Sequence, residues 1–362
     1  MTRWFIGFGA RLRRPTLAPL ALVALLALVA LLAVLAGCGG SSADGYGGAK
    51  NHIHDLVALS GASNTLLVAS HIGLYRTADG GKTWSEVAGG AGQLMDGLMI
   101  YKLSQSPVEP KRVYALAGYR PDDKAAAAKG DLGVYLSEDA GQTWKLVTPL
   151  SAFPNSALFT VVAGAGAAGQ VFAVVPNVGA KGLYASDDAG AHWRMQPDLP
   201  TDSINGLVAD AGKPGRLWAY SVSAGLYSSD DDGGHWKVAQ GLRGGVSSVA
   251  VAGRTVYAVG DNGLYVSKDD GAGFARANGD ITFSAVAASS QDPATAYTLT
   301  GAAVYTSSDS GASWRQTGPI SHQPSYLTVD PASAATVYAG ASYPIAVEAT
   351  SDGGARWSAI MP

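Results

Sequence analysis

The chain has 362 residues, of which 47% are hydrophobic and 47 are glycine, and its formal net charge at pH 7 is −3. A slightly acidic chain lacks the basic surface that binds phosphate groups, so the charge argues against a nucleic-acid partner. Many glycines together with frequent Val, Tyr and Trp are typical of a turn-rich β protein. The single cysteine leaves no intrachain disulfide, so packing must stabilise the fold.

The N-terminal residues 1–37 are predicted to be a secretion signal peptide. Four arginines between positions 3 and 14 precede a segment, 15–43, that contains no charged residue. Within it, residues 17–36 form a near-continuous run of Leu, Ala and Val. A basic start followed by an apolar run is the pattern of an export signal. A run of about 20 apolar residues is also long enough to span a bilayer, so an uncleaved membrane anchor is the alternative.

The end of the apolar run carries a lipidation motif. Residues Leu35-Ala36-Gly37-Cys38 resemble the bacterial lipobox, whose cysteine is lipidated and becomes the first residue of the mature chain. The resemblance implies lipid attachment at Cys38, and with it an extracytoplasmic protein anchored to the bacterial cell membrane or envelope. Residues 38–51 are small and polar, which is typical of a flexible tether. The folded domain is therefore expected to span residues 52–362.

From residue 52 onward the chain repeats one unit. The eight-residue motif Ser/Thr-x-Asp-x-Gly-x-x-Trp, here called a box, occurs seven times, with Phe in place of Trp in the fifth copy. Box aspartates follow one another at intervals from 38 residues (Asp231 to Asp269) to 60 residues (Asp79 to Asp139). One four-stranded propeller blade takes about 40–50 residues. The boxes span residues 77–84, 137–144, 186–193, 229–236, 267–274, 307–314 and 350–357.

This spacing predicts an all-β fold, a seven-bladed β-propeller of four-stranded antiparallel blades. Each box is expected to be a structural turn: its Asp and Ser/Thr oxygens accept backbone hydrogen bonds, its Gly takes a positive φ, and its aromatic residue begins the next strand as a buried anchor. The residues given this structural role are Asp79, Asp139, Asp188, Asp231, Asp269, Asp309, Asp352, Trp84, Trp144, Trp193, Trp236, Phe274, Trp314 and Trp357.

The strand order predicts which loops share a face. With strands lettered A to D outward from the axis, each box joins C to D, so blade 1 starts with its strand A near His52 and blade 7 ends with its strand D after Trp357. The ring then closes without strand exchange. The D–A and B–C loops lie on the face opposite the boxes, and the longest insertion there is the expected partner-binding or mobile element. The segments placed on that face are 88–98, 116–132, 148–156, 175–181, 317–325 and 340–345.

Four of the six histidines are expected to gather near blade 1. His52 and His54 are two residues apart at the start of an innermost strand and so share a face. His71 lies in the B–C loop of the same blade, and the loops that carry Asp96 and His322 open beside it. Such a patch can bind a divalent transition metal through the four histidines, or supply catalytic groups from His71 and Asp96. The alternative is that these histidines hydrogen-bond the backbone or one another where blades 7 and 1 meet.

The aspartates suggest two further kinds of site. Adjacent box acids, such as Asp187-Asp188, Asp230-Asp231-Asp232 and Asp269-Asp270, offer the oxygen ligands that Ca²⁺ prefers. They lie in separate blades with two or three carboxylates each, so solvated turns are the expected interpretation. A glycosidase instead needs two paired carboxylates, and the sequence does not say which acids pair. The candidates on the face opposite the boxes are Asp96, Asp122, Asp123, Asp131, Asp202 and Asp280.

The box series resembles the Asp-box (BNR) repeat superfamily over residues 52–362. Sialidases, two-propeller xyloglucanases, sortilin-type propellers and photosystem II assembly propellers belong to it. The chain is most similar to bacterial lipid-anchored BNR-repeat proteins described as glycosylhydrolase-like, through His52-Ile53-His54-Asp55-Leu56 and Ser70-His71-Ile72-Gly73-Leu74. The resemblance implies a WD40/YVTN-like propeller.

The resemblance does not settle an activity. The sialidase string Arg-Ile-Pro is absent, the chain has one propeller where the xyloglucanases have two, and the Gly-Trp-Ala strands of the photosystem assembly factors are missing. Every strong motif in the sequence concerns the fold or export, and no catalytic set is identifiable. The sequence therefore favours a module at the cell envelope that binds a protein or glycan. The alternatives are a glycoside hydrolase of extracellular glycan, other than a typical sialidase, and a metal-binding envelope protein.

Overall fold

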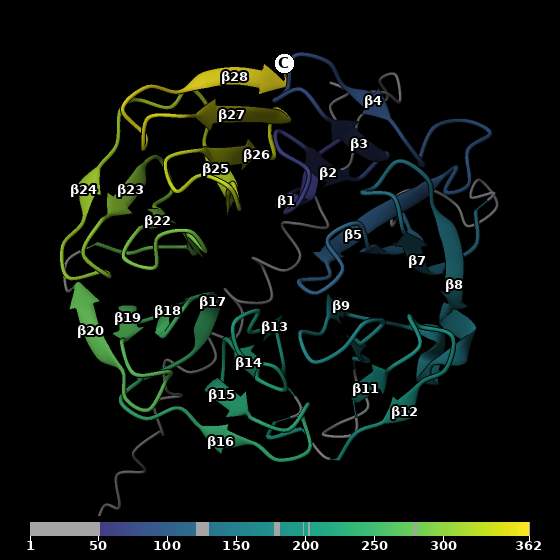
Figure 1. Cartoon of the computed structure of the whole chain (residues 1–362), viewed down its shortest axis with the longest axis horizontal. Helices are drawn as coiled ribbons and strands as arrows, with labels where there is room; N and C mark the ends of the chain where they lie inside the picture. The colour runs from purple at the N-terminus through teal and green to yellow at the C-terminus, as the bar shows by residue number, and fades with distance from the viewer. Residues whose placement is uncertain are drawn as a thin grey trace, which may run out of the picture. The chain divides into compact units, whose positions relative to one another are not determined.

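The computed structural model describes residues 51–120, 130–176, 182–197, 199–201, 203–278 and 281–361. These residues form seven four-stranded antiparallel sheets around a central axis (Figure 1). Each sheet uses four consecutive strands that run from the axis outward, which confirms the predicted seven-bladed propeller. The predicted signal peptide and Cys38 lie outside the described residues. Within the described part, no helix is long and apolar enough to cross a membrane.

The first three blades contain β1 to β12. Blade 1 consists of β1 (Ile53–Ala58), β2 (Leu66–Ser70), β3 (Leu74–Thr77) and β4 (Ser85–Glu86). Blade 2 consists of β5 (Leu98–Gln105), β6 (Val113–Tyr119), β7 (Gly133–Ser137) and β8 (Lys145–Pro149), followed by two short 3-10 helices, η2 (Leu150–Ala152) and η3 (Pro154–Ser156). Blade 3 consists of β9 (Thr160–Ala163), β10 (Val171–Val174), β11 (Leu183–Ser186) and β12 (Arg194–Met195).

The last four blades contain β13 to β28. Blade 4 consists of β13 (Gly206–Ala209), β14 (Leu217–Ser221), β15 (Gly225–Ser229) and β16 (Lys237–Val238). Blade 5 consists of β17 (Val246–Ala252), β18 (Thr255–Gly260), β19 (Gly263–Ser267) and β20 (Ala275–Asn278). Blade 6 consists of β21 (Ala285–Ala288), β22 (Ala296–Leu299), β23 (Val304–Ser307) and β24 (Arg315–Gln316). Blade 7 consists of β25 (Pro324–Val329), β26 (Val337–Ala341), β27 (Ala346–Thr350) and β28 (Ser358–Met361).

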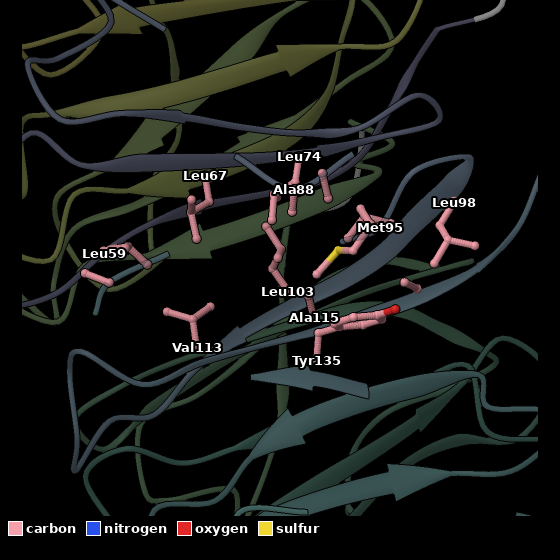
Figure 2. Packing of buried hydrophobic residues seen from close by; sticks show 14 residues of the cluster. Leu59, Leu67, Leu74, Ala88, Met95, Leu98, Leu103, Val113, Ala115 and Tyr135 are labelled. Carbon is pink, nitrogen blue, oxygen red and sulfur yellow. The ribbon is translucent and has the colours of Figure 1, made fainter. Parts of the chain in front are cut away.

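The hydrophobic core lies between neighbouring blades. Between blades 1 and 2, Leu67 and Leu74 face Leu103, Ala115 and Tyr135, and all five side chains are buried (Figure 2). Because each blade packs against two neighbours, its middle strands are buried on both faces and read as continuous apolar runs. Full burial of one large apolar side chain is worth about 1.5–3 kcal/mol. The ring is therefore held together by repeated contacts of the same kind.

Blades 7 and 1 close the ring without exchanging a strand, as the sequence predicts. The four strands of each blade pair only in chain order, and β1 packs directly against β25 and β26. Leu56 and Val68 of blade 1 share a buried cluster with Tyr338 of blade 7. The indole of Trp84, in the first box, donates a hydrogen bond to the carbonyl of Ile360 on β28 (2.7 Å). Apolar packing and this hydrogen bond together form the seam.

Every box is the turn between the third and fourth strands of its blade. In the first box, the Thr77 hydroxyl donates to Asp79 Oδ1 (2.8 Å), and it accepts from the N–H of Gly81 (2.9 Å). Asp79 Oδ1 also accepts from the N–H of Thr83 (2.9 Å). The other six boxes repeat these three bonds. The predicted turn chemistry is confirmed.

Two details of the boxes differ from the prediction. Positive φ occurs both at the box glycine and at the residue before it, which is Ala140 in the second box and Asp232 in the fourth. The box tryptophans are half-buried, whereas Phe274 of the fifth box is buried. Five of the six indoles donate a hydrogen bond from the ring nitrogen to a carbonyl or hydroxyl of the turn or of the neighbouring blade, as Trp193 does. The ring nitrogen of Trp236 has no hydrogen-bond partner among the described residues.

Candidate functional site at the axial end of blade 1

The two faces of the ring carry different connections. Strands alternate in direction within each blade, so the boxes and the A–B turns emerge on one face, here called the box face. The D–A and B–C loops emerge on the opposite face, here called the loop face. The candidate residues of blade 1 lie on the loop face, because His52 precedes β1 and His71 follows β2. Parts of two predicted loop segments, 121–129 and 177–181, lie outside the described residues.

Three histidines converge at this end of blade 1. The N–H of His71 donates to the carbonyl of His52 (2.9 Å), which extends the β1–β2 pairing by one step. The register of β1 shifts between Ile53 and Asp55, so His54 occupies a β-bulge. The ligand atoms of His52, His54 and His71 all lie within 4.8 Å of one another. The prediction that these three residues come together is confirmed, while their chemical role stays a prediction.

The imidazole rings of the trio lie against each other and against two tyrosines. The ring centroids of His52 and His71 are 4.9 Å apart with a tilt of 26°, and those of His52 and His54 are 4.5 Å apart. Tyr343, on the B–C loop of blade 7, lies 5.3 Å from His52, and Tyr101 of β5 lies 5.8 Å from His54. His71 is 3% exposed and His52 is 9% exposed. The trio is therefore largely shielded by aromatic neighbours.

Burial and neighbouring groups keep His54 uncharged. Burial lowers the pKa of His54 to about 3, and the positive charges that His52 and His71 would carry lower it further in the same direction. The Nε2 atom of His54 is buried and has no hydrogen-bond partner among the described residues. A neutral imidazole with an available lone pair is the form that binds metal ions.

An ion pair lies beside the trio, facing the axis. Lys102 Nζ of β5 lies 2.9 Å from Asp55 Oδ2 of β1. The same carboxylate accepts backbone hydrogen bonds from Leu103 and Leu56. Burial lowers the pKa of Lys102, but Asp55 opposes this effect and the net shift is upward. Asp55 Oδ2 is thus held by two residues of blade 2, and Asp55 Oδ1 by the backbone of its own strand.

Two tyrosines from distant blades contribute to the same axial cluster. Burial raises the pKa of Tyr326, on β25, to about 12, with a further increase from Asp55. Burial also raises the pKa of Tyr220, on β14, and the nearby Lys102 opposes this shift. The charges of Asp55 and Lys102, on blades 1 and 2, therefore act on tyrosines of blades 7 and 4. Sequence analysis missed this cluster because no local motif links the four residues.

Asp96 lies in a second polar group, made of Glu86, Asp96 and Arg120. Burial raises the pKa of Glu86, Asp96 raises it further, and Arg120 opposes both. Arg120 donates to the carbonyl of Ile72 (3.0 Å), which links blade 2 to the His71 turn. A Cβ on Gly73 would lie 2.4 Å from Glu86 Oε1, so only glycine fits above this carboxylate. Sequence analysis did not single out Glu86 or pair Asp96 with it.

The structure pairs His322 with a different residue from the one expected. Its Nδ1 lies 2.9 Å from Oε1 of Glu348, which is 2% exposed on β27. The N–H groups of Ser321 and His322 also donate to this carboxylate. Among the described residues, the histidine group with metal-binding geometry contains the blade 1 trio without His322. The expectation that His322 joins the trio is therefore corrected: a buried carboxylate needs donors, and His322 supplies one.

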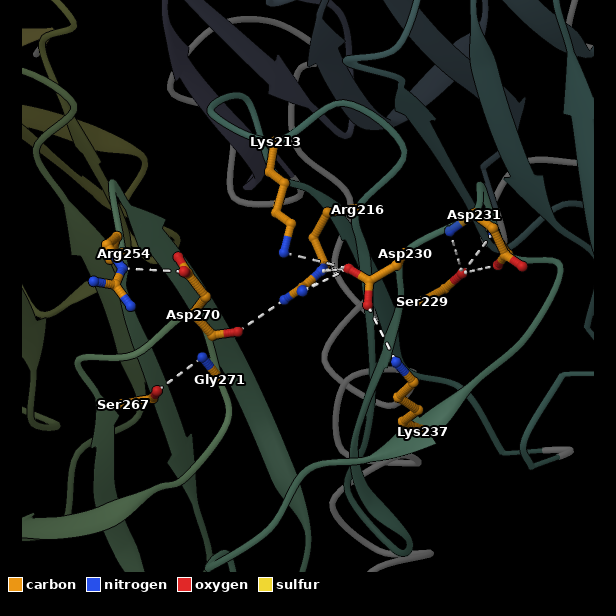
Figure 3. A network of polar contacts seen from close by, with 11 residues as sticks. Lys213, Arg216, Ser229, Asp230, Asp231, Lys237, Arg254, Ser267, Asp270 and Gly271 are labelled. Atoms are coloured by element: carbon orange, nitrogen blue, oxygen red, sulfur yellow. Dashed lines mark hydrogen bonds and ion pairs between the residues drawn. The ribbon is translucent and has the colours of Figure 1, made fainter.

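The acidic residues of the boxes form ion pairs on the box face. Asp230 lies 2.6 Å from Arg216 and also near Lys213 and Lys237, while Asp270 pairs with Arg254 (3.1 Å) (Figure 3). No three-carboxylate group suited to a metal occurs among the described residues. Asp131 is exposed. The remaining carboxylate candidates Asp122, Asp123, Asp202 and Asp280, and the lipidation candidate Cys38, lie outside the described residues.

Comparison with known proteins supports the fold. No protein-family model matches the chain, and no curated protein matches it. A GH74 enzyme from Niastella koreensis matches with a TM-score of 0.68 at 16% identity, over 87% of this chain and 54% of that chain. YCF48 from Cyanidioschyzon merolae matches with a TM-score of 0.61 at 14% identity, over 83% and 96%. A structure of YCF48 bound to D1 peptide matches with a TM-score of 0.60 at 14% identity, over 82% of this chain and 93% of that chain.

These similarities concern the architecture alone. All three identities lie below 20%, and this chain spans about half the length of the GH74 enzyme. The same architecture occurs in GH74 enzymes and in a protein solved with a bound peptide, so the fold does not decide the function and the site residues must.

Proposed function

We propose that this chain is an exported propeller, anchored by lipid at Cys38, that binds a protein partner on its loop face. We also place it in the Asp-box repeat superfamily, because every box forms the same three hydrogen bonds. The observation that supports partner binding is the position of the exposed apolar side chains. When the large exposed apolar residues of a domain concentrate on one face, that face is a candidate interaction surface.

Most exposed large apolar residues of the described part lie on the loop face. Nine such residues occur in the described part, and six of them lie on D–A loops, on B–C loops or on strands near that face. The six are Leu94, Tyr101, Tyr119, Phe159, Val222 and Tyr343. Of the other three, Val108 lies on an A–B turn of the box face, while Met195 and Val238 lie on outermost strands. The box face is comparatively poor in exposed apolar groups.

The composition of this surface favours a protein as the partner. Three of the six side chains are tyrosines and one is a phenylalanine, and aromatic residues are enriched in the centres of protein interfaces. Tyr343 is 61% exposed. The peptide complex of YCF48 adds that a propeller of this architecture can bind a peptide. A glycan, which also stacks on tyrosine, is the alternative outcome of the test.

Photo-crosslinking in the producing cells tests the proposal. A photoreactive phenylalanine analogue would replace Tyr343, Tyr119 or Val222 in the full-length protein. The same discrete protein adduct should form from at least two of these positions. Val108 is the matched control, because it is 46% exposed on the box face where Val222 is 48% exposed on the loop face. An equal yield of that adduct from Val108, or no adduct from any loop-face position, contradicts the proposal.

The lipid anchor has a separate test. In the Cys38→Ser variant we expect the precursor to remain unprocessed and to lose incorporation of labelled fatty acid. Processing and fatty-acid labelling equal to those of the wild type would contradict lipidation at Cys38. This outcome would leave partner binding on the loop face intact, since the crosslinking experiment does not depend on the anchor.

A glycoside hydrolase is the second candidate, and one observation favours it. Glu86 and Asp96 lie near enough that the charge of Asp96 raises the pKa of Glu86, in addition to the larger effect of burial. A carboxylic acid with a raised pKa beside a second carboxylate is what a general acid in glycoside hydrolysis requires. Release of reducing sugar from a panel of soluble and cell-wall glycans should then be lost in Glu86→Gln and kept in Asp131→Asn. No release by the wild-type protein rules this candidate out.

A further inference from the structure

The geometry points to a transition-metal site in which His52, His54 and His71 bind one Zn²⁺ or Cu²⁺ ion. This inference goes beyond partner binding and does not depend on it. Imidazole nitrogen is a preferred ligand of both ions, and three histidines with an open fourth position form a well-known class of zinc site.

The distances suit a single ion. Two nitrogen ligands at about 2.0–2.1 Å from one metal lie about 3.4 Å apart in a tetrahedron and at most about 4.2 Å apart. In the structure, the three ligand atoms lie within 4.8 Å of one another. Rotation of the imidazole rings about their side-chain bonds can close a gap of this size. The rings of His52 and His71 are stacked, with centroids 4.9 Å apart and an angle of 26° between their planes.

The backbone holds the three residues in place before any ion binds. His52 and His54 belong to one strand end, and the β1–β2 pairing with the His71 to His52 hydrogen bond fixes the third residue. His54 lies at the β-bulge, and its ligand atom is within 4.8 Å of those of the other two histidines. Ligands placed by paired strands keep their geometry better than ligands on a free loop. Only side-chain rotation is then required for binding.

The nearest carboxylate is already engaged elsewhere. Asp55 follows His54 directly in the chain, but its oxygens accept from Lys102, Leu103 and Leu56. The described carboxylates therefore add no fourth ligand to the trio. Buried His54 Nε2 has no hydrogen-bond partner in the described part, which is costly for a polar atom unless a ligand binds it. Three imidazole nitrogens leave one position of a tetrahedral site for water or for a ligand group.

That open position is expected to face the loop side of the ring. Tyr343, whose ring lies 5.3 Å from His52, is 61% exposed, so solvent reaches the surroundings of the trio. The rival interpretation is that the histidines only reinforce the seam between blades 7 and 1. The two interpretations differ in a measurable way: a metal site binds one ion and gains thermal stability from it, while a seam contact does neither.

The experiment is a metal titration of the full-length protein, purified in detergent and stripped with a chelator. Zn²⁺ and Cu²⁺ are added separately in competition with a chromophoric chelator, and melting temperatures are recorded with and without each ion. We expect one ion per chain and a higher melting temperature at saturation. In His52→Gln, His54→Gln and His71→Gln, affinity should fall by more than the 10–100-fold that is typical for loss of an outer-shell partner.

The controls are His192→Gln and His235→Gln, which remove exposed histidines on the box face, and His322→Gln. Affinity should be unchanged in all three. Should the trio variants fold poorly, electron paramagnetic resonance of Cu²⁺ on the wild-type protein counts the nitrogen ligands directly, and three are expected. Absence of stoichiometric binding of both ions, or equal affinity in wild type and trio variants, would overturn the inference.

Discussion

The box face and the loop face of the ring differ in how their polar groups are satisfied. The box face repeats one hydrogen-bonded turn seven times, and in six of the turns a side chain also binds the second oxygen of the box aspartate. The loop face instead holds polar clusters that occur once, such as the histidine trio with its unpaired His54 Nε2. Polar groups that repeat in every blade and have hydrogen-bond partners maintain the architecture. Functional residues are therefore expected among the polar groups that occur once and lack such partners.

The fifth box shows that even the repeated face adapts to its surroundings. Trp218 occupies the position on β14 where the equivalent strands carry Tyr114, Tyr257 and Tyr297. The aromatic residue packed against it is Phe274, with ring centroids 6.3 Å apart, whereas Tyr257 packs against Trp314 at 6.4 Å. A larger residue on one blade is thus balanced by a smaller one on the next. Blade packing therefore decides which aromatic a box uses.

Acidification should have the largest effect on the box face. Hydrogen bonds lower the pKa of Asp231, Asp309 and Asp352 from 3.8 to about 2, and they also lower those of Asp79, Asp139, Asp188 and Asp269. A carboxyl whose folded pKa is depressed stabilises the fold above its unfolded pKa, and this stability is lost as pH falls through the folded pKa. Circular dichroism should show a steep loss of stability between about pH 4 and 2. A melting temperature that is constant down to pH 2 would contradict the assigned role.

Weakening the contact between blades 7 and 1 should cause the next largest loss of stability. Replacing a large buried aromatic by alanine costs about 3–5 kcal/mol, and Trp84 is half-buried, so Trp84→Ala should cost about 3 kcal/mol. Trp144→Ala is the matched control, because this indole donates to Gly141 within its own box. Chemical denaturation measures both. If Trp144→Ala and Trp84→Ala lower the free energy of unfolding equally, the hydrogen bond to Ile360 does not stabilise the contact between blades 7 and 1.

A substitution in the fifth box can disturb the packing of this box against Trp218. Gly271 has φ +83° and a Cβ there would lie 2.0 Å from Trp218. Gly271→Ala combines an unfavourable left-handed conformation with overpacking, so we expect a loss of about 2–4 kcal/mol. Adding Trp218→Tyr should recover part of the loss. If the double variant shows purely additive losses in unfolding experiments, the two residues are not coupled.

The smallest expected effect is a gain in stability. Gly273 stands where the other boxes carry the residue that binds the second aspartate oxygen, and a Cβ there would meet only Asp269 Oδ2 at 3.9 Å. Gly273→Ser should stabilise the protein by about 0.5–1 kcal/mol, through chain entropy and a new hydrogen bond. Gly273→Ala is the control that isolates the entropic part. Equal unfolding free energies for both variants would show that the hydroxyl makes no useful bond.

The sequence predicts the parts of this structure that depend on local spacing. Seven boxes at blade-length intervals indicate seven blades, and His52, His54 and His71 converge because they occupy neighbouring ends of one hairpin. The pairing of His322 with Glu348 could not be predicted in this way, since Glu348 occupies the middle of a buried strand, between Val347 and Ala349. From the sequence alone, position 348 resembles a core position, because the groups that donate hydrogen bonds to its carboxylate lie on a distant loop.

The axial cluster shows most clearly what the sequence cannot predict. Tyr220 reaches across Gly206, where a Cβ would lie 2.1 Å from its hydroxyl, toward Lys102 on a blade two positions away. Which blades meet at the axis depends on the radius of the ring and on side-chain length, and neither is encoded in strand periodicity. Glu86 and Arg120 were missed for a similar reason, because they belong to different blades.

The central claim is that the box face maintains the fold while the loop face carries chemistry. Its most direct test measures both melting temperature and Zn²⁺ affinity for His54→Gln and for Asp309→Ala. We predict that His54→Gln loses Zn²⁺ binding and keeps the melting temperature of the metal-free wild type, and that Asp309→Ala melts at a lower temperature with unchanged affinity. If His54→Gln instead lowers the metal-free melting temperature as much as Asp309→Ala and leaves Zn²⁺ affinity unaltered, the histidines are structural and the division between the faces is wrong.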